Sequence, residues 1–159
     1  MAGVRIYDTA VAPQWIDYNG HLRDGYYSVI FSSAVDALMD RLGLDAAYRE
    51  RTHCTLYTLE MHLHFLHEVK QSDALSVQVR ILAADRKRIH AAFEMYAART
   101  PEAVATAEFM LLHVSQQPEV RAVAFPPEMS TAIEQLQVAS AALPATGPSS
   151  RAIELRSRP

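Results

Sequence analysis

The segment that most constrains the fold is residues 24–42, DGYYSVIFSSAVDALMDRL. Its polar side chains recur at every fourth position, which on a helix places them in one narrow stripe: Ser28, Ser32, Asp36 and Asp40. Most of the remaining circumference is apolar, with Tyr26, Tyr27, Val29, Ile30, Phe31, Val35, Leu38, Met39 and Leu42. A helix that is apolar over so much of its surface has to be enclosed by other parts of the chain. A curved sheet wrapped around it would provide that enclosure.

Both ends of this helix carry recognisable signals. Asp24 is a candidate N-cap, because its carboxylate can accept hydrogen bonds from the first free backbone amides. Gly43 is well placed as a C-terminal stop, since glycine readily adopts the left-handed conformation that ends many helices. We therefore expect the helix to begin near Asp24 and to end at Leu42.

Strand patterns dominate the rest of the chain. A short strand is expected at residues 5–11, and longer ones at residues 54–67, 75–81, 89–98 and 103–115. The clearest alternation places four apolar side chains on one face, namely Leu75, Val77, Val79 and Ile81. One strand, a long helix and a run of four strands predict an α+β fold, in which a curved antiparallel sheet of about five strands wraps the helix.

We expect one domain over residues 1–138, because a chain of 159 residues fits a single domain with its own core. A loop or short helix is expected at residues 45–52 and a second helix at residues 127–138. From residue 139 to residue 159 the sequence has the mixture of alanine, serine and proline that is typical of a mobile tail.

The composition argues against nucleic-acid and membrane partners. The net charge is -3, so no basic field would recruit a polyanion. The most apolar window, residues 26–44, is interrupted by serine, aspartate and arginine, which argues against a membrane span. A single cysteine agrees with a reducing compartment, and no secretory signal is visible at the N-terminus. We expect a cytoplasmic protein.

Asp17 lies in the sequence D-Y-N-G-H, immediately before the enclosed helix. A carboxylate beside a helix N-terminus faces free backbone N–H groups and the positive end of the helix dipole. Those amides can hold a thioester oxygen as negative charge develops on it, while the carboxylate attacks the carbonyl carbon or activates a water molecule. The alternative is that Asp17 only caps a turn whose backbone conformation Gly20 permits.

The stretch Asp17-x-x-Gly20-His21, followed by Tyr27 and Phe31 on the helix, resembles the signature of the 4-hydroxybenzoyl-CoA thioesterase branch of the hot-dog superfamily. The order of elements agrees over about residues 5 to 115. The resemblance implies a hot-dog fold and an acyl-CoA substrate. It also implies that Asp17 is the catalytic carboxylate. For such a thioesterase we expect no cofactor and no metal.

The same resemblance implies that backbone amides near Asp24, Gly25 and Tyr26 polarise the thioester carbonyl. The family usually has two asparagines where this chain has Arg23 and Asp24. Arg23 is therefore a departure that bears on the substrate contacts. The residues expected to contact substrate are Trp15, Tyr18, Asn19, Gly20, His21, Arg23, Tyr27, Glu60 and His62.

Aromatic side chains are dense around the expected site. The segments WIDYNGHLRDGYY and TLEMHLHFLHE resemble thioesterases of bacterial carnitine breakdown, which release betaine from betainyl-CoA. Ring faces attract quaternary ammonium groups, so Trp15, Tyr18 or Tyr26 could surround a cationic acyl group, with Glu60 as its counter-charge. The alternative is that the rings only pack the helix, an interpretation that we favour for Tyr27.

Two further groups of residues allow competing interpretations. Glu60, His62 and His64 share one strand face, a spacing that metals use, but no third-ligand pattern supports a metal. The basic residues Arg86, Lys87 and Arg88 lie on an expected turn, where they would be solvated surface or would meet the phosphates of CoA.

The leading hypothesis is an acyl-CoA thioesterase. The alternatives are a hot-dog hydratase or dehydratase, in which Asp17 and His21 would move a proton at carbon, and an acyl-CoA-binding protein without catalysis. A single hot-dog sheet leaves long strand edges, which pairing across a two-fold axis would cover. We therefore expect a homodimer or homotetramer, with residues 56–66 at the contact.

Overall fold

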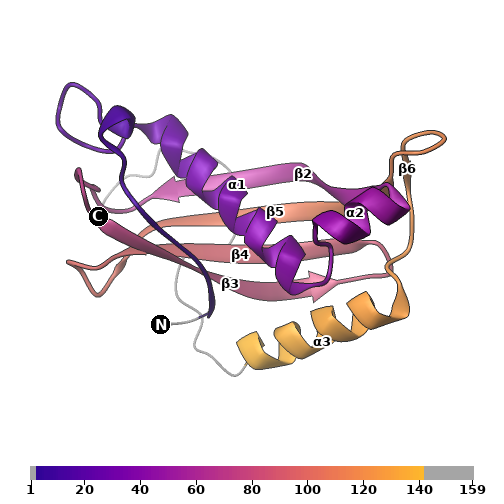
Figure 1. Cartoon of the computed structure of the whole chain (residues 1–159). Coiled ribbons are helices and arrows are strands. Elements are labelled where there is room, and N and C mark those ends of the chain that lie inside the picture. Colours follow the sequence, from indigo (N-terminus) through magenta and orange to yellow (C-terminus); the bar gives the residue numbers. More distant parts are fainter. Residues whose placement is uncertain (1–2, 142–159) are drawn as a thin grey trace, which may run out of the picture.

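The long helix predicted from residues 24–42 lies across one face of a curved sheet (Figure 1). The computed structural model describes residues 3–141 of the chain. Helix α1 spans Asp24–Arg41, and Phe31 and Leu38 in its middle are completely buried. Phe31 packs edge-on against Phe93 of the sheet with ring centroids 6.4 Å apart, and Phe93 packs in the same way against Phe109 at 5.2 Å. The enclosure that the apolar helix demands is therefore supplied by the sheet.

Within residues 3–141 the sheet has six strands in the order β1-β3-β4-β5-β2, with β6 paired to β5. All the pairings are antiparallel. The strands are β1 (Val4–Ala10), β2 (Cys54–Phe65), β3 (Ala74–Ala84), β4 (Arg88–Ala97), β5 (Ala103–Ser115) and the two-residue β6 (Arg121–Ala122). The predicted α+β class with about five long antiparallel strands is confirmed.

Strand alternation sorts the sheet into an apolar face and a polar face. Odd-numbered residues of β3, β4 and β5 form the face under α1, and those of β4 are almost completely buried: Ile89, Ala91, Phe93, Met95 and Ala97. The opposite face carries polar residues in register, since Glu94 of β4 lies opposite Thr106 of β5, and His62 of β2 lies opposite Glu108 of β5.

The ends of the helices refine the prediction. Gly43 has φ +84° and follows α1 as expected. Asp24 is the first helical residue rather than the N-cap, a position that Arg23 occupies without a side-chain cap, so the expectation of an Asp24 cap is corrected. The short helix α2 (Ala46–Thr52) is capped by Asp45, whose carboxylate accepts a hydrogen bond from the N–H of Tyr48 at 2.8 Å.

Helix α3 (Pro127–Ala141) runs three residues beyond the expected end at residue 138. The reason is packing, because the Ser140 side chain is fully buried and its Oγ accepts a hydrogen bond from the N–H of Ile81 at 3.3 Å. That part of β3 lies beyond its pairing with β1, so α3 covers an otherwise open strand edge (Figure 1). The rest of the expected tail, residues 142–159, lies outside the described residues.

The helices within residues 3–141 include none that is long and apolar enough to cross a membrane.

Candidate functional site

The Asp17 side chain closes the loop in which it lies. Its Oδ1 accepts hydrogen bonds from the N–H of Asn19 at 2.8 Å and from the N–H of His21 at 3.2 Å. The backbone closes the same turn, with the Asp17 N–H donating to the His21 carbonyl at 2.8 Å and the Gly20 N–H donating to the Asp17 carbonyl at 3.1 Å. Gly20 has φ +79°, a left-handed conformation that glycine adopts without strain. The spacing D-x-x-G-H is therefore the sequence of a carboxylate-closed turn.

These hydrogen bonds also set the charge of Asp17. The N–H of His21 is the largest cause that holds the pKa of the Asp17 carboxyl below its ordinary value of 3.8. Desolvation is the next largest cause and opposes it, and the N–H of Asn19 adds a smaller effect that also lowers the pKa. The carboxylate is thus ionised near neutral pH. Its second oxygen, Oδ2, has no hydrogen-bond partner within residues 3–141, so it is free to act on a substrate.

The loop is held against the rest of the fold on both sides. The N–H of Leu22 donates to the Val69 carbonyl at 2.8 Å, and the N–H of Arg23 donates to the Trp15 carbonyl at 3.0 Å. Leu22 and Val69 are both buried. The segment that follows β2 is therefore fastened to the start of α1, at the end of the molecule where β2 finishes (Figure 1).

Of the three backbone amides expected to polarise a carbonyl, two already have partners. The N–H of Gly25 donates to Oδ1 of Asp24 at 2.8 Å, and the N–H of Tyr26 donates to the carbonyl of Arg23 at 3.0 Å. The Asp24 N–H has no partner among the described residues. It lies at the first position of an 18-residue helix, where the dipole presents positive charge. Asp24 thus offers the open donor.

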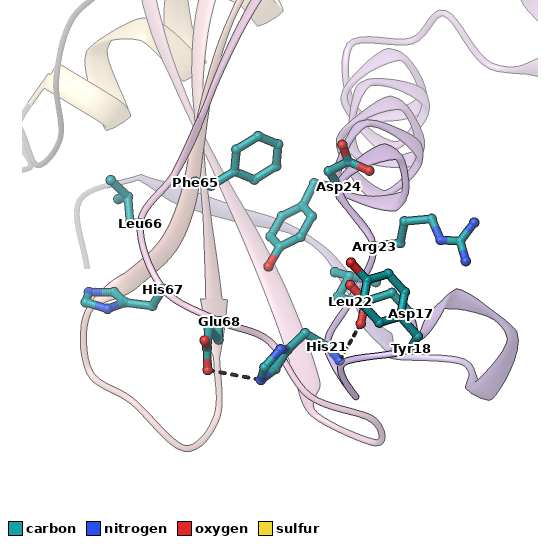
Figure 2. Close-up of a pocket in the computed structure, with 11 residues that line it drawn as sticks. Asp17, Tyr18, His21, Leu22, Arg23, Asp24, Phe65, Leu66, His67 and Glu68 are labelled. Carbon is teal, nitrogen blue, oxygen red and sulfur yellow. Dashed lines mark hydrogen bonds and ion pairs between the residues drawn. The ribbon is translucent and has the colours of Figure 1, made fainter. Parts of the chain in front are cut away.

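Asp17 and Asp24 line one pocket of about 670 Å³ (Figure 2). The pocket brings together part of the expected set, namely Asp17, Tyr18, His21, Arg23, Asp24 and Tyr27. It also contains five residues that sequence reasoning missed: Leu22, Phe65, Leu66, His67 and Glu68. Its formal charges are three carboxylates and one guanidinium, with the histidines taken as neutral.

Glu68 is the most consequential of the missed residues. Its Oε2 lies 3.0 Å from Nε2 of His21, and the two side chains point toward each other (Figure 2). Phe65, at the end of β2, packs edge-on against Tyr27 with ring centroids 5.0 Å apart. Burial raises the pKa of Tyr27 above its ordinary value of 10.0, so its hydroxyl stays neutral.

Several expected site residues lie outside this pocket. Trp15 and Tyr26 stack on each other at 5.6 Å, Asn19 and Gly20 shape the Asp17 turn, and Gly25 only neighbours the open amide. In the single chain, the positions of Trp15 and Tyr26 are therefore explained by packing. Packing explains Tyr27 only in part, because Tyr27 is buried but also lines the pocket.

Glu60 and His62 belong to a different hollow, of about 220 Å³, on the polar face of the sheet. Oε1 of Glu60 lies 2.7 Å from Nε2 of His62, and beside them Oε1 of Glu108 lies 2.5 Å from Nε2 of His90. Across the described part of the chain, no group of three or more His, Cys, Asp or Glu side chains is placed to hold a metal ion.

The basic turn lies at the far end of the sheet from Asp17 within one chain, because it joins the end of β3 to the start of β4 (Figure 1). Arg88 pairs with Asp85, whose Oδ2 lies 2.6 Å from Nη2 of Arg88, and this hydrogen bonding is the main cause that lowers the pKa of Asp85 to about 2. Arg86 and Lys87 use backbone carbonyls to hold Phe125 and His113. The turn thus has structural roles of its own.

Comparison with known proteins identifies the family. Residues 11–133 match the model of the thioesterase-like superfamily. The chain is 46% identical over 138 residues to a betainyl-CoA thioesterase of Pseudomonas aeruginosa, which covers 87% of this chain and 86% of that protein. It is also 40% identical over 111 residues to the L-carnitine dehydrogenase/betainyl-CoA thioesterase of Rhizobium meliloti, a match that covers 70% of this chain and 22% of the longer protein.

Solved structures agree. A putative thioesterase from Pseudomonas putida superposes with a TM-score of 0.86 at 40% identity, covering 99% of both chains. A Staphylococcus aureus protein solved in complex with CoA superposes with a TM-score of 0.84 at 30% identity, covering 97% of this chain and 98% of that one. The chain therefore belongs to the thioesterase-like superfamily and has the hot-dog fold that its sequence predicts.

Proposed function

We propose that this thioesterase hydrolyses betainyl-CoA to betaine and CoA. The observation that carries the proposal is the pocket itself, in which an ionised carboxylate with a free oxygen accompanies an unpaired helix N-terminal amide. The surrounding charge supports a cationic acyl group, since three carboxylates face one guanidinium. The extent of identity to the Pseudomonas aeruginosa betainyl-CoA thioesterase, over most of both chains, supports the same substrate.

The proposed reaction uses groups of the chain alone. The thioester carbonyl oxygen accepts a hydrogen bond from the Asp24 N–H, which strengthens as negative charge develops in the tetrahedral transition state. Oδ2 of Asp17 attacks the carbonyl carbon or removes a proton from an attacking water, while the N–H groups of Asn19 and His21 hold Oδ1 still. CoA leaves as a thiolate, which needs no strong general acid because a thiol has a pKa of about 8.5.

An aspartate with a lowered pKa suits either role for Asp17. A nucleophile would form a mixed anhydride with the acyl group, which water then cleaves to regenerate the carboxylate. A general base would take the proton of water directly. Both routes consume one water and yield a carboxylic acid and a thiol.

The binding of CoA is tied to the oligomer. Strand β2 is an edge of the sheet, and apolar side chains along it are exposed in the single chain: Leu59 at 55%, Met61 at 37% and Phe65 at 54%. An unpaired edge of twelve residues favours pairing with a second copy, so we expect at least a homodimer with residues 56–66 at the contact.

The same pairing would bring the basic turn, Arg86, Lys87 and Arg88, of one chain close to the Asp17 pocket of the other. Strand β4 has ten residues, a length of about 30 Å at roughly 3.3 Å per residue, which separates its Arg88 end from the Asp17 end within one chain. Antiparallel pairing of β2 with its copy would turn the second chain around. Its basic turn would then lie at the end of the joint sheet that holds Asp17, within reach of CoA phosphates.

A panel of acyl-CoAs tests the function. Aliphatic, aromatic and betainyl thioesters are incubated with the protein without added metal, and free thiol is measured. We expect multiple turnovers with betainyl-CoA. Modification of the acyl group without thiol release would instead indicate a hydratase, and binding without any reaction would indicate an acyl-CoA-binding protein.

A further inference from the structure

We propose that Glu68 selects the cationic acyl group, by supplying a carboxylate to the Asp17 pocket, which the rings of Tyr18 and Phe65 also line. The inference rests on the proposed function and deepens it, since it names the residue that would distinguish a quaternary ammonium from a neutral group of the same shape. A quaternary ammonium donates no conventional hydrogen bond, so ring faces and an unneutralised carboxylate are the groups that recognise it.

The backbone fixes the position of Glu68. The next residue, Val69, is fully buried and its carbonyl accepts the N–H of Leu22 at 2.8 Å. The carbonyl of Glu68 itself accepts a hydrogen bond from the guanidinium of Arg99. A bridge between His21 and Lys70 continues the attachment. The segment after β2 therefore cannot withdraw from the Asp17 loop without breaking these bonds.

The Glu68 carboxylate keeps an oxygen for a ligand. Oε2 lies 3.0 Å from Nε2 of His21, whereas Oε1 has no partner within residues 3–141. The nearby guanidinium of Arg99 has its own counter-charge, because its Nε lies 2.8 Å from Oδ2 of Asp73. Arg23 also lines the pocket, but Figure 2 shows its guanidinium pointing away from Glu68.

His21 connects the acyl-recognition group to the reacting group. Its backbone N–H holds Oδ1 of Asp17, while its ring holds Oε2 of Glu68. One residue thus sets the separation between the two carboxylates. In an acyl group as short as betainyl, the ammonium is one methylene from the carbonyl carbon, so its counter-charge has to lie in the same pocket as Asp17.

Exposed rings complete the arrangement. Tyr18 lines the pocket and leaves 95% of its surface exposed. Phe65 also lines the pocket and contacts Tyr27 edge-on at 5.0 Å, but it lies in the segment expected at the dimer contact, so its exposure of 54% holds for the single chain only. The free ring of Tyr18, in the same pocket as the Glu68 carboxylate, suits an alkylated cation.

The other carboxylates are less suited to this role. Asp17 is the reacting group, and Asp24 already accepts the N–H of Gly25. Glu60, which the sequence suggested as the counter-charge, pairs with His62 in the separate hollow on the polar face. Asp8 of β1 provides the control, because its side chain is 57% exposed, pairs with Arg5 and lies outside the pocket and outside the expected dimer contact.

The test compares betainyl-CoA with 3,3-dimethylbutyryl-CoA, in which carbon replaces the cationic nitrogen at nearly constant shape. Their kcat/KM values are measured by thiol release for the wild type, E68Q and D8N. We expect E68Q to reduce the betainyl preference by about tenfold or more while the neutral ester changes by less than about threefold. D8N should keep both values.

Three outcomes are distinguishable. An E68Q variant that keeps the wild-type preference would overturn the role of Glu68 and leave the proposed function intact. Equal losses with both esters would also overturn it, because Glu68 would then act by positioning His21. A wild type without any preference for betainyl-CoA would contradict the proposed substrate itself. Since the Glu68 side chain is 69% exposed, E68Q is not expected to unfold the protein, and a thermal melt checks this.

Discussion

A proline at position 24 would remove the unpaired backbone N–H of Asp24 and leave helix α1 intact. We predict that D24P lowers kcat by about a hundredfold relative to D24A. Proline at the first helical position lacks only an N–H that has no intrahelical partner, and its ring fixes a φ that suits the helix. The preceding residue, Arg23, already has φ -63° and ψ 139°, within the region that a residue before proline adopts.

The magnitude follows from the distribution of donors. Because Gly25 and Tyr26 already donate elsewhere, the oxyanion depends on the one remaining amide in the first turn. Removing a single oxyanion donor typically lowers kcat by about 10²–10³, or roughly 2.7–4 kcal/mol. D24A is the matched control: both variants lose the carboxylate and free the Gly25 N–H alike, and only D24A retains the N–H of residue 24.

The assay is the rate of thiol release at saturating acyl-CoA, with circular dichroism and thermal melts for both variants. D24P should melt close to D24A while its kcat falls and its KM changes little. Equal kcat values in two folded variants would refute the assignment of the Asp24 N–H and would place the oxyanion contact elsewhere in the pocket.

Three further predictions concern the loop, the charge and the assembly. Gly20 and Gly43 have φ +79° and +84°, and an added Cβ at either position would meet no atom within 4 Å. The strain of the left-handed conformation should therefore make G20A and G43A each less stable by about 1–2 kcal/mol, measured by urea unfolding. Only G20A should lower kcat. An unchanged kcat in G20A would show that the turn need not hold Asp17. Since the pKa of Asp17 lies below 3.8, protonation of Asp17 should reduce kcat/KM only below about pH 4. A fall of kcat/KM centred well above pH 5 in the pH–rate profile would point to another group. Sedimentation at micromolar concentration should give a dimer or larger assembly, and a monomer would count against contact through β2.

The sequence predicted what depends on neighbouring residues. Asp17, Gly20 and His21 lie within five positions, so the chemistry of this turn could be predicted without knowledge of the fold. The apolar circumference of residues 24–42 was equally local, and it required an enclosing sheet. The N-cap was misplaced by one residue, because Asp24 binds the next amide instead of capping the helix.

Residues of the site that are far from Asp17 in the sequence could not be predicted. Glu68 depends on the attachment of Val69 to Leu22, a contact between segments that no periodicity predicts. Strand alternation put Glu60 on a face with His62 but could not show that this face lies away from Asp17. The end of α3 was missed for a similar reason, since Ser140 belongs to the helix through its contact with β3.

The account depends most on the carboxylate of Asp17, and D17N tests it directly. Asparagine keeps an oxygen that can accept the N–H groups of Asn19 and His21, so the turn should persist, but the negative charge and the nucleophilicity are lost. The measurement is the turnover of betainyl-CoA by thiol release, with circular dichroism to verify the fold. We predict a loss of about a hundredfold or more. A folded D17N that turns over at close to the wild-type rate would contradict the mechanism.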